Sequence, residues 1–318
     1  MAMQNPFTTA LQDAGELLIG PLRSPRQMLA TQQYDNHTSI HDDATAQKLG
    51  FKGGTIEGPT HFSQFAPLGF ALWGNGWFET GCLSAHYRNP CFEGEQVRAF
   101  MARPRDGVTH TAIWMQREDG TEILRGTASV GDSNPPSALE QRIAQLDAPD
   151  QLVILRDVRV GMRTQRVRVS MGANQNMGAL YPFSLADKLQ VITENSPWYS
   201  VTGATASPWG RAIIPMEMIS VLLNHSREGE QLPVRGPVVG LFADQEIRLR
   251  NGPLFVGEAY EISREVVALS GSRRTESMWV LTSVFAPGSE TVLATMLLNS
   301  ASLKDSYASY AAEQRTLT

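Results

Sequence analysis

The 318-residue chain has only two cysteines, Cys82 and Cys91, which argues against a fold held together by several disulfides. No apolar run approaches the roughly 20 residues that a membrane-spanning helix needs. The amino terminus lacks a basic segment followed by an apolar one, which a secretory signal would show. We therefore expect a cytoplasmic protein with no membrane partner.

Basic residues are also scattered rather than clustered. The sequence has 27 Lys and Arg residues against 32 Asp and Glu residues, which gives a formal net charge of −5, and it contains no basic run. Proteins that bind nucleic acid usually present a clustered positive surface. No nucleic-acid partner is therefore expected.

Cofactor and metal motifs are missing as well. His37 and His41 are four residues apart, but no further Cys, His or carboxylate follows at a spacing typical of zinc sites. The cluster Gly50-x-x-Gly53-Gly54 lacks the Gly-Lys-Ser/Thr ending of a phosphate loop, and no dinucleotide-binding fingerprint is present. The sequence therefore favours an enzyme that uses no cofactor and no metal.

What the sequence does contain is a dense polar stretch ahead of an apolar helix. Residues 34–59 carry several titratable side chains and pass through four glycines to Pro59, and the apolar run 61–73 follows. Proline fits the first turn of a helix, where its missing N–H costs nothing. The amino end of a helix offers free N–H groups and a partial positive charge, which suits a developing oxyanion. This stretch is the candidate site.

The spacing within this stretch matches a known signature. In chain order it contains Asn36-x4-His41, Asp43-x-x-Ala46, Gly50-Phe51 and Gly53-x-x-Ile56-x-Gly58. This order resembles the hydratase signature of MaoC-like hot-dog proteins, in which an Asp and a His activate water for addition to a trans-2-enoyl-CoA. Two positions depart from the signature, because Asn36 stands where the family has its Asp and Glu57 stands where it often has His. The resemblance is strong over residues 25–130 and weaker over 180–302.

The apolar pattern predicts one central helix and a set of strands. Pro67 and Gly69 interrupt the run after Pro59, so we expect a kinked or stepped helix, since proline removes an i to i−4 hydrogen bond. Past Gly81 the period becomes extended. The predicted strands of the first half lie at 83–91, 96–103, 108–117 and 122–130, and a short helix lies at 138–146.

The second half repeats the first. Gly94 and Gly257 lie in similar segments 163 residues apart, and Pro59 matches Pro215 at a separation of 156. Such spacing indicates a domain duplication and not a solenoid repeat. The predicted second half contains a helix at 215–225 and strands near 243–250, 258–268, 276–285 and 291–300.

The resemblance and the repeat together predict an α+β double hot dog, in which two fused antiparallel-sheet units each wrap a central helix. The predicted parts are a first unit at 1–137 with the better-preserved motif, a linker and lead-in at 138–180, a second unit at 181–303 and a polar tail at 304–318.

In the second unit, Glu194 falls on Asn36 and Tyr199 falls on His41. A Glu–Tyr pair is a poor general base system, because a phenol titrates near pH 10. The second site is therefore predicted to be degenerate.

Three residues are the first candidates for catalysis. His41 would handle a proton, since histidine titrates near neutrality; its ordinary alternative is a loop histidine bound to backbone. Asn36 would hold water, because an amide cannot act as a base; Asn is also a common turn residue. By resemblance, the Gly58 N–H would stabilise an enolate, and the alternative is a tight turn into the helix.

Three further residues remain possible. Asp35 would supply the missing carboxylate if the loop shifts by one residue. Glu57 precedes the helix, where the helix dipole alone favours a carboxylate. His61 lies on the helix and faces either the pocket or the core.

The resemblance implies a substrate that is an acyl thioester of coenzyme A or of an acyl-carrier protein. The main hypothesis is a hydro-lyase that interconverts enoyl and 3-hydroxyacyl thioesters. A homodimer is the possible assembly. The alternatives are an acyl-CoA thioesterase that uses Glu57 and a non-catalytic acyl-binding or scaffold protein.

Overall fold

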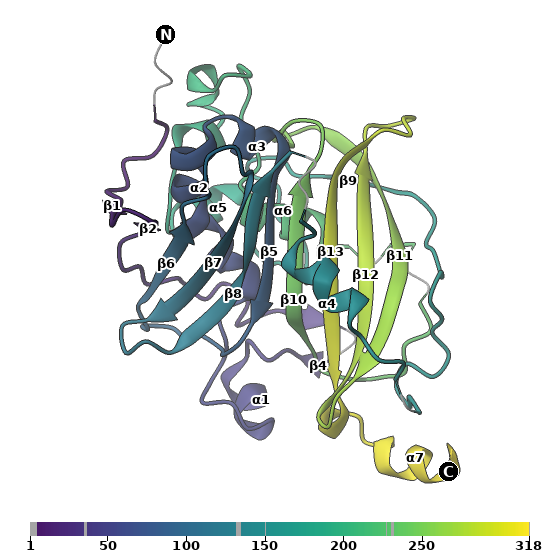
Figure 1. Ribbon diagram of the computed structural model, residues 1–318. Helices are drawn as coiled ribbons and strands as arrows, with labels where there is room; N and C mark the ends of the chain where they lie inside the picture. Colours follow the sequence, from purple (N-terminus) through teal and green to yellow (C-terminus); the bar gives the residue numbers. More distant parts are fainter. Residues whose placement is uncertain are drawn as a thin grey trace.

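One antiparallel sheet runs through the whole molecule. The computed structural model describes residues 5–34, 37–131, 135–149, 151–226, 228–229 and 232–317. In these residues an 11-stranded sheet has the order β1-β2-β6-β7-β8-β5-β10-β13-β12-β11-β9 (Figure 1). None of the helices in the described ranges is both long enough and apolar enough to cross a membrane.

The first unit forms one half of this sheet. Its long strands are β5 (Gly81–Tyr87), β6 (Val97–Ala102), β7 (His110–Arg117) and β8 (Glu122–Val130), so the four predicted strands are confirmed with small shifts at their ends. Two short strands, β1 (Gln12–Asp13) and β2 (Leu17–Ile19), extend this half. Buried and half-buried residues alternate along β6, as expected for a strand with one face against a core.

The second unit forms the other half. Its strands are β9 (Val167–Ser170), β10 (Gly240–Leu249), β11 (Ala259–Gly271), β12 (Thr275–Phe285) and β13 (Val292–Leu303). Strand β10 pairs with β5, where Glu246 lies opposite Ser84, and this pairing joins the two halves into one continuous sheet. The α+β class expected from the sequence is confirmed.

The central helices lie together on one face of the sheet (Figure 1). The first unit contributes a 3₁₀ helix, η1 (Gly58–Phe65), followed directly by α2 (Ala66–Trp73) and then α3 (Gly76–Thr80), so the stepped helix is confirmed. Pro67 lies in the first turn of α2, where it removes no hydrogen bond. The second unit contributes α6 (Met216–Asn224), which packs against η1.

The opposite face carries α4 (Ala138–Ala144), which crosses in front of β10 and β13 in Figure 1. Ser137 and Glu140 form a capping box at its start. The carboxyl end of the chain forms α7 (Tyr310–Leu317). The remaining elements are β3 (Gln33–Tyr34), β4 (His37–Thr38), α1 (Asp43–Lys48), α5 (Leu185–Leu189), η2 (Pro197–Tyr199), η3 (Ala204–Ala206) and η4 (Lys304–Ser306).

The two units repeat the same local hydrogen bonds. The Asn89 side chain donates to the Glu122 carbonyl at 2.8 Å, and the Asn251 side chain donates to the Val292 carbonyl at 2.7 Å. Both asparagines therefore fix the same strand end in the two copies.

The predicted match of Pro59 with Pro215 is wrong. Glu57 is the residue before η1, and Pro215 is the residue before α6. The two residues occupy corresponding positions, since the Thr60 N–H donates to the Glu57 carbonyl and the Met218 N–H donates to the Pro215 carbonyl. The structural counterpart of Pro59 is therefore residue 217.

Candidate active site

A cavity of about 710 Å³ opens at the amino end of η1. Its wall on the first unit includes His41, Glu57, Gly58, His61 and Tyr87, which the chain brings from the polar loop, η1 and β5. On the second unit the lining comes from the end of α6, the chain after it and the strands β10 to β13, with apolar side chains that include Phe242, Met278, Val280, Met296 and Leu298. One cavity thus joins polar groups from the first unit to a mainly apolar wall from the second, which also includes the charged side chains Arg235 and Arg264.

His41 is held in one tautomer by the main chain. Its Nδ1 lies 2.6 Å from the Thr55 carbonyl oxygen, which only accepts, so Nδ1 carries the hydrogen. Burial lowers the pKa of His41 to about 4, although this hydrogen bond opposes the shift. His41 is therefore neutral near pH 7, and its Nε2 has a lone pair that can accept a proton.

Gly58 begins η1 and lies in the cavity wall. Among the described residues its N–H has no hydrogen-bond partner, as expected for the first position of a helix. A Cβ at this position would lie 2.4 Å from Cζ of Tyr87. The structure thus gives a reason for glycine that the sequence did not, namely the close packing of the Tyr87 ring.

Gly58→Ala is expected to lower the free energy of unfolding by about 1–3 kcal/mol, because the new methyl group must displace the Tyr87 ring. Urea unfolding measures the change. Gly76→Ala is the matched control, since a Cβ at Gly76 meets no atom of the described residues within 4 Å. Equal stabilities of the two variants would show that the Tyr87 ring moves aside without cost.

Glu57 is the one carboxylate among the described residues that line the cavity. It is buried, makes no capping hydrogen bond to η1, and accepts a hydrogen bond from the Tyr181 hydroxyl at 3.0 Å. Burial raises the pKa of Glu57 to about 7, while Lys188 and the Tyr181 hydrogen bond act in the opposite direction. Glu57 therefore exchanges a proton near neutral pH, which a carboxylate held only by the helix dipole would not do.

His61 is buried in the same wall, and its Nδ1 has no partner among the described residues. Burial lowers the pKa of His61 to about 3, and Lys188 and Arg117 lower it further. His61 is thus a neutral polar group that faces the cavity. Asn36 and Asp35 lie outside the described residues, so their predicted roles remain predictions.

The arrangement as a whole is similar to a solved structure. A structure described as a MaoC domain protein dehydratase from Chloroflexus aurantiacus J-10-fl matches with a TM-score of 0.57 at 13% identity, over 95% of this chain and 99% of that chain. The chain has the double hot-dog fold of MaoC-like proteins.

Other solved double hot dogs and MaoC-like structures match less closely. A MaoC-like dehydratase has a TM-score of 0.49 at 13% identity, over 95% of this chain and 98% of its own. A Mycobacterium tuberculosis protein described as a double hot dog has a TM-score of 0.47 at 10% identity, over 82% of this chain and 86% of its own. No protein-family model matches the sequence, and a search of curated proteins finds no match.

Behind the cavity, the double hot dog contains a buried ion pair that the sequence analysis missed. Lys188 from α5 lies 3.2 Å from Glu217 on α6 and also donates to the Thr60 hydroxyl at 3.2 Å. Ser63 on η1 donates to the second oxygen of Glu217 at 2.6 Å. One signal was available, because a carboxylate inside the apolar run Met-Glu-Met-Ile of a central helix requires a buried partner.

In the second unit of this double hot dog, the counterparts of Asn36 and His41 are occupied by contacts with other residues of the chain. Glu194 is buried and accepts hydrogen bonds from the Thr9 hydroxyl and, at 2.6 and 3.2 Å, from the Arg23 guanidinium. Tyr199 is buried against the Phe7 ring, and burial raises its pKa. Both side chains thus make their contacts within the chain, and the degenerate second site stays a prediction.

Proposed function

We propose that the protein is a hydro-lyase that interconverts 2-enoyl and 3-hydroxyacyl thioesters at the first unit's site. One observation carries the proposal. His41 and Glu57 line one cavity beside the Gly58 N–H, and their pKa values are shifted in opposite directions, that of His41 downward and that of Glu57 upward. At neutral pH His41 is an unprotonated acceptor, whereas a large fraction of Glu57 is protonated. Dehydration needs such a pair, one base and one acid.

In the dehydration direction, Nε2 of His41 takes the proton from Cα of the 3-hydroxyacyl thioester. The electron pair of that bond moves toward the thioester carbonyl, whose oxygen accepts a hydrogen bond from the Gly58 N–H at the positive end of η1. The Cβ–O bond then breaks as Glu57 donates its proton to the departing hydroxyl, which leaves as water. Transfer of the proton from His41 back to Glu57 restores the enzyme, and hydration follows the same steps in reverse.

Charge conservation within the pair supports this division of roles. A neutral His41 and a protonated Glu57 become a cation and an anion, so the net charge of the cavity does not change during the reaction. In a buried site this avoids the cost of creating an isolated charge. Glu57 thus replaces the family's carboxylate, and Asn36 keeps the water-holding role that the resemblance implies.

A thioesterase is the second candidate, and Glu57 is the observation that favours it. A buried carboxylate with a pKa of about 7 can remove a proton from water that attacks the thioester carbonyl. That reaction would need no base at His41. The two candidates therefore differ in their products and in their dependence on His41.

Mass spectrometry of the purified protein with enoyl- and 3-hydroxyacyl-CoA esters tests the proposal. We expect interconversion by one water, with Glu57→Gln strongly reduced because glutamine holds no transferable proton. Free coenzyme A as the product would identify a thioesterase instead. Unchanged esters throughout the panel would identify a binding or scaffold protein.

A further inference from the structure

The second unit's part of the cavity wall includes a segment that lies outside the sheet. Residues 234–238, together with Leu232 and Leu155, line the cavity along with side chains of β12 such as Met278 and Val280. These residues belong to chain segments that connect α6 to β10 and precede β9. We call Leu155, Leu232 and residues 234–238 the tethered wall.

The tethered wall has its own small hydrophobic cluster, separate from the main core. Leu155, Met278 and Val280 are buried in it, and Leu232 and Val238 pack against it. Tyr307 and Tyr310, at the carboxyl end of the chain, pack against the same cluster. A small cluster contributes little burial of its own, so the position of this wall depends on its polar contacts.

The first of these contacts is made by Glu276 on β12, whose side chain is fully buried. Its carboxylate accepts hydrogen bonds from the Val153 and Leu155 N–H groups at 2.8 and 3.0 Å and from the Tyr310 hydroxyl at 2.9 Å. Charge-assisted hydrogen bonds of this kind are among the stronger ones in proteins. Glu276 therefore ties Leu155 to the start of α7.

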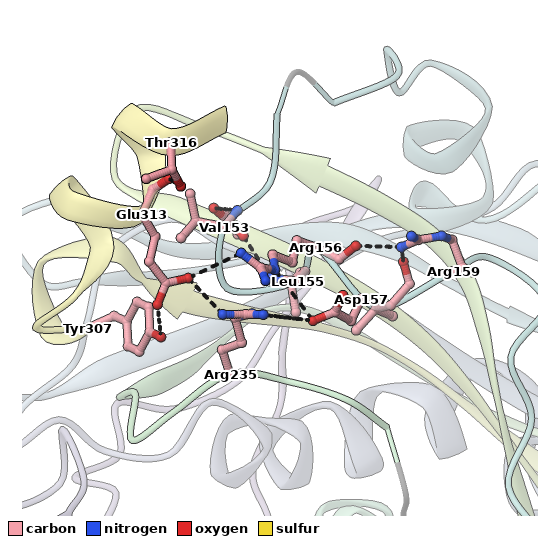
Figure 2. A network of polar contacts seen from close by, with 11 residues as sticks. Val153, Leu155, Arg156, Asp157, Arg159, Arg235, Tyr307, Glu313 and Thr316 are labelled. Atoms are coloured by element: carbon pink, nitrogen blue, oxygen red, sulfur yellow. Dashed lines mark hydrogen bonds and ion pairs between the residues drawn. The ribbon is translucent and has the colours of Figure 1, made fainter. Parts of the chain in front are cut away.

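The second contact is made by Arg235, which itself lines the cavity. Figure 2 shows its guanidinium between Glu313 and Asp157, with Tyr307 beside Glu313. Arg235 donates to Glu313 at 2.8 Å and to Asp157 at 3.1 and 3.3 Å, and the Tyr307 hydroxyl donates to the other oxygen of Glu313 at 2.7 Å. We call the Glu276–Tyr310 and Arg235–Glu313 contacts the two tethers. Both meet on α7, where Tyr310 and Glu313 are three residues apart and lie on one face.

We propose that α7 sets the longest acyl chain the cavity accepts, by holding the tethered wall against β12 through Tyr310 and Glu313. The inference rests on the proposed function, since it assumes that an acyl chain occupies the apolar part of the cavity. Tyr310 and Glu313 do not themselves line the cavity, so they act as positioning residues. Weakening either tether lets the wall move outward and makes room for further methylene groups.

Binding of S-alkyl coenzyme A thioethers tests this inference, because these probes cannot be turned over. In the wild type, calorimetry should show an affinity that rises about fourfold per methylene up to a limiting length and then stops rising. Glu313→Gln and Tyr310→Phe should each extend that limit and leave the affinity for short chains unchanged. The ratio of long-chain to short-chain affinity should therefore rise at least about fourfold in both variants.

Glu290→Gln is the matched control, because it breaks an exposed Glu–Arg pair with Arg166 at 2.6 Å that does not touch the cavity. It should leave the limiting length unchanged. A limit that stays fixed in both α7 variants, even with a lower melting temperature, would overturn the inference and leave the proposed function standing. If the wild type binds no thioether of any length, the inference and the proposed function both fail.

Discussion

Replacing His41 by alanine should lower turnover of the enoyl or 3-hydroxyacyl thioester about 10²- to 10⁴-fold, the usual loss when a general base is removed. The physical reason is the tautomer: the Thr55 carbonyl holds the hydrogen on Nδ1, so Nε2 is the atom that can take the proton. His41→Asn should lose as much activity, although its amide can still donate to the same carbonyl. Steady-state kinetics with the coenzyme A esters measure both losses.

His225→Ala is the matched control for this experiment. The Nδ1 of His225 also lies near a main-chain carbonyl, that of Leu222 at 2.9 Å, and burial also lowers its pKa. His225 does not line the cavity, so its loss should leave kcat close to that of the wild type. Turnover that survives in His41→Ala but disappears in Glu57→Gln would contradict the proposed base and favour the thioesterase.

The elements of the fold that repeat a local pattern could be predicted from the sequence. The four strands of the first unit follow period-two runs separated by turns, and Pro67 marks the step between η1 and α2. Strands β1, β2 and β9 could not be predicted in this way. They contain only two to four residues and exist because β1 pairs with β2, β2 pairs with β6 and β9 pairs with β11.

The candidate site was only partly predictable, for a related reason. His41 and Gly58 lie within the motif, and the structure brings both to the cavity. Glu57 looked like a residue placed by the helix dipole, and its environment comes from Tyr181, which is 124 residues away in sequence. No motif marks Tyr181 or Lys188, because their role depends on how α5 and the chain before it pack against η1.

The largest expected effect on stability concerns the buried pair between Lys188 and Glu217. Lys188→Met should lower the free energy of unfolding by about 3–5 kcal/mol near neutral pH, since it leaves the Glu217 carboxylate buried without its cation. The double variant Lys188→Met, Glu217→Leu should recover most of this loss, because replacing both members of a buried pair by apolar groups is often neutral. Urea unfolding of the three proteins measures both differences.

The pH dependence of this loss has a definite sign. Burial raises the pKa values of Glu217 and Glu57 above their ordinary value of 4.5, and Lys188 acts against both shifts, so Lys188→Met raises them further. A carboxyl group whose pKa is raised in the folded state stays protonated there, so the stability present below about pH 4.5 is lost as the pH rises through the neutral range. Lys188→Met should therefore be close to the wild type in acid and much less stable above neutral pH. A loss of equal size at both pH values would show that the missing contact is packing of the lysine stem and not its charge.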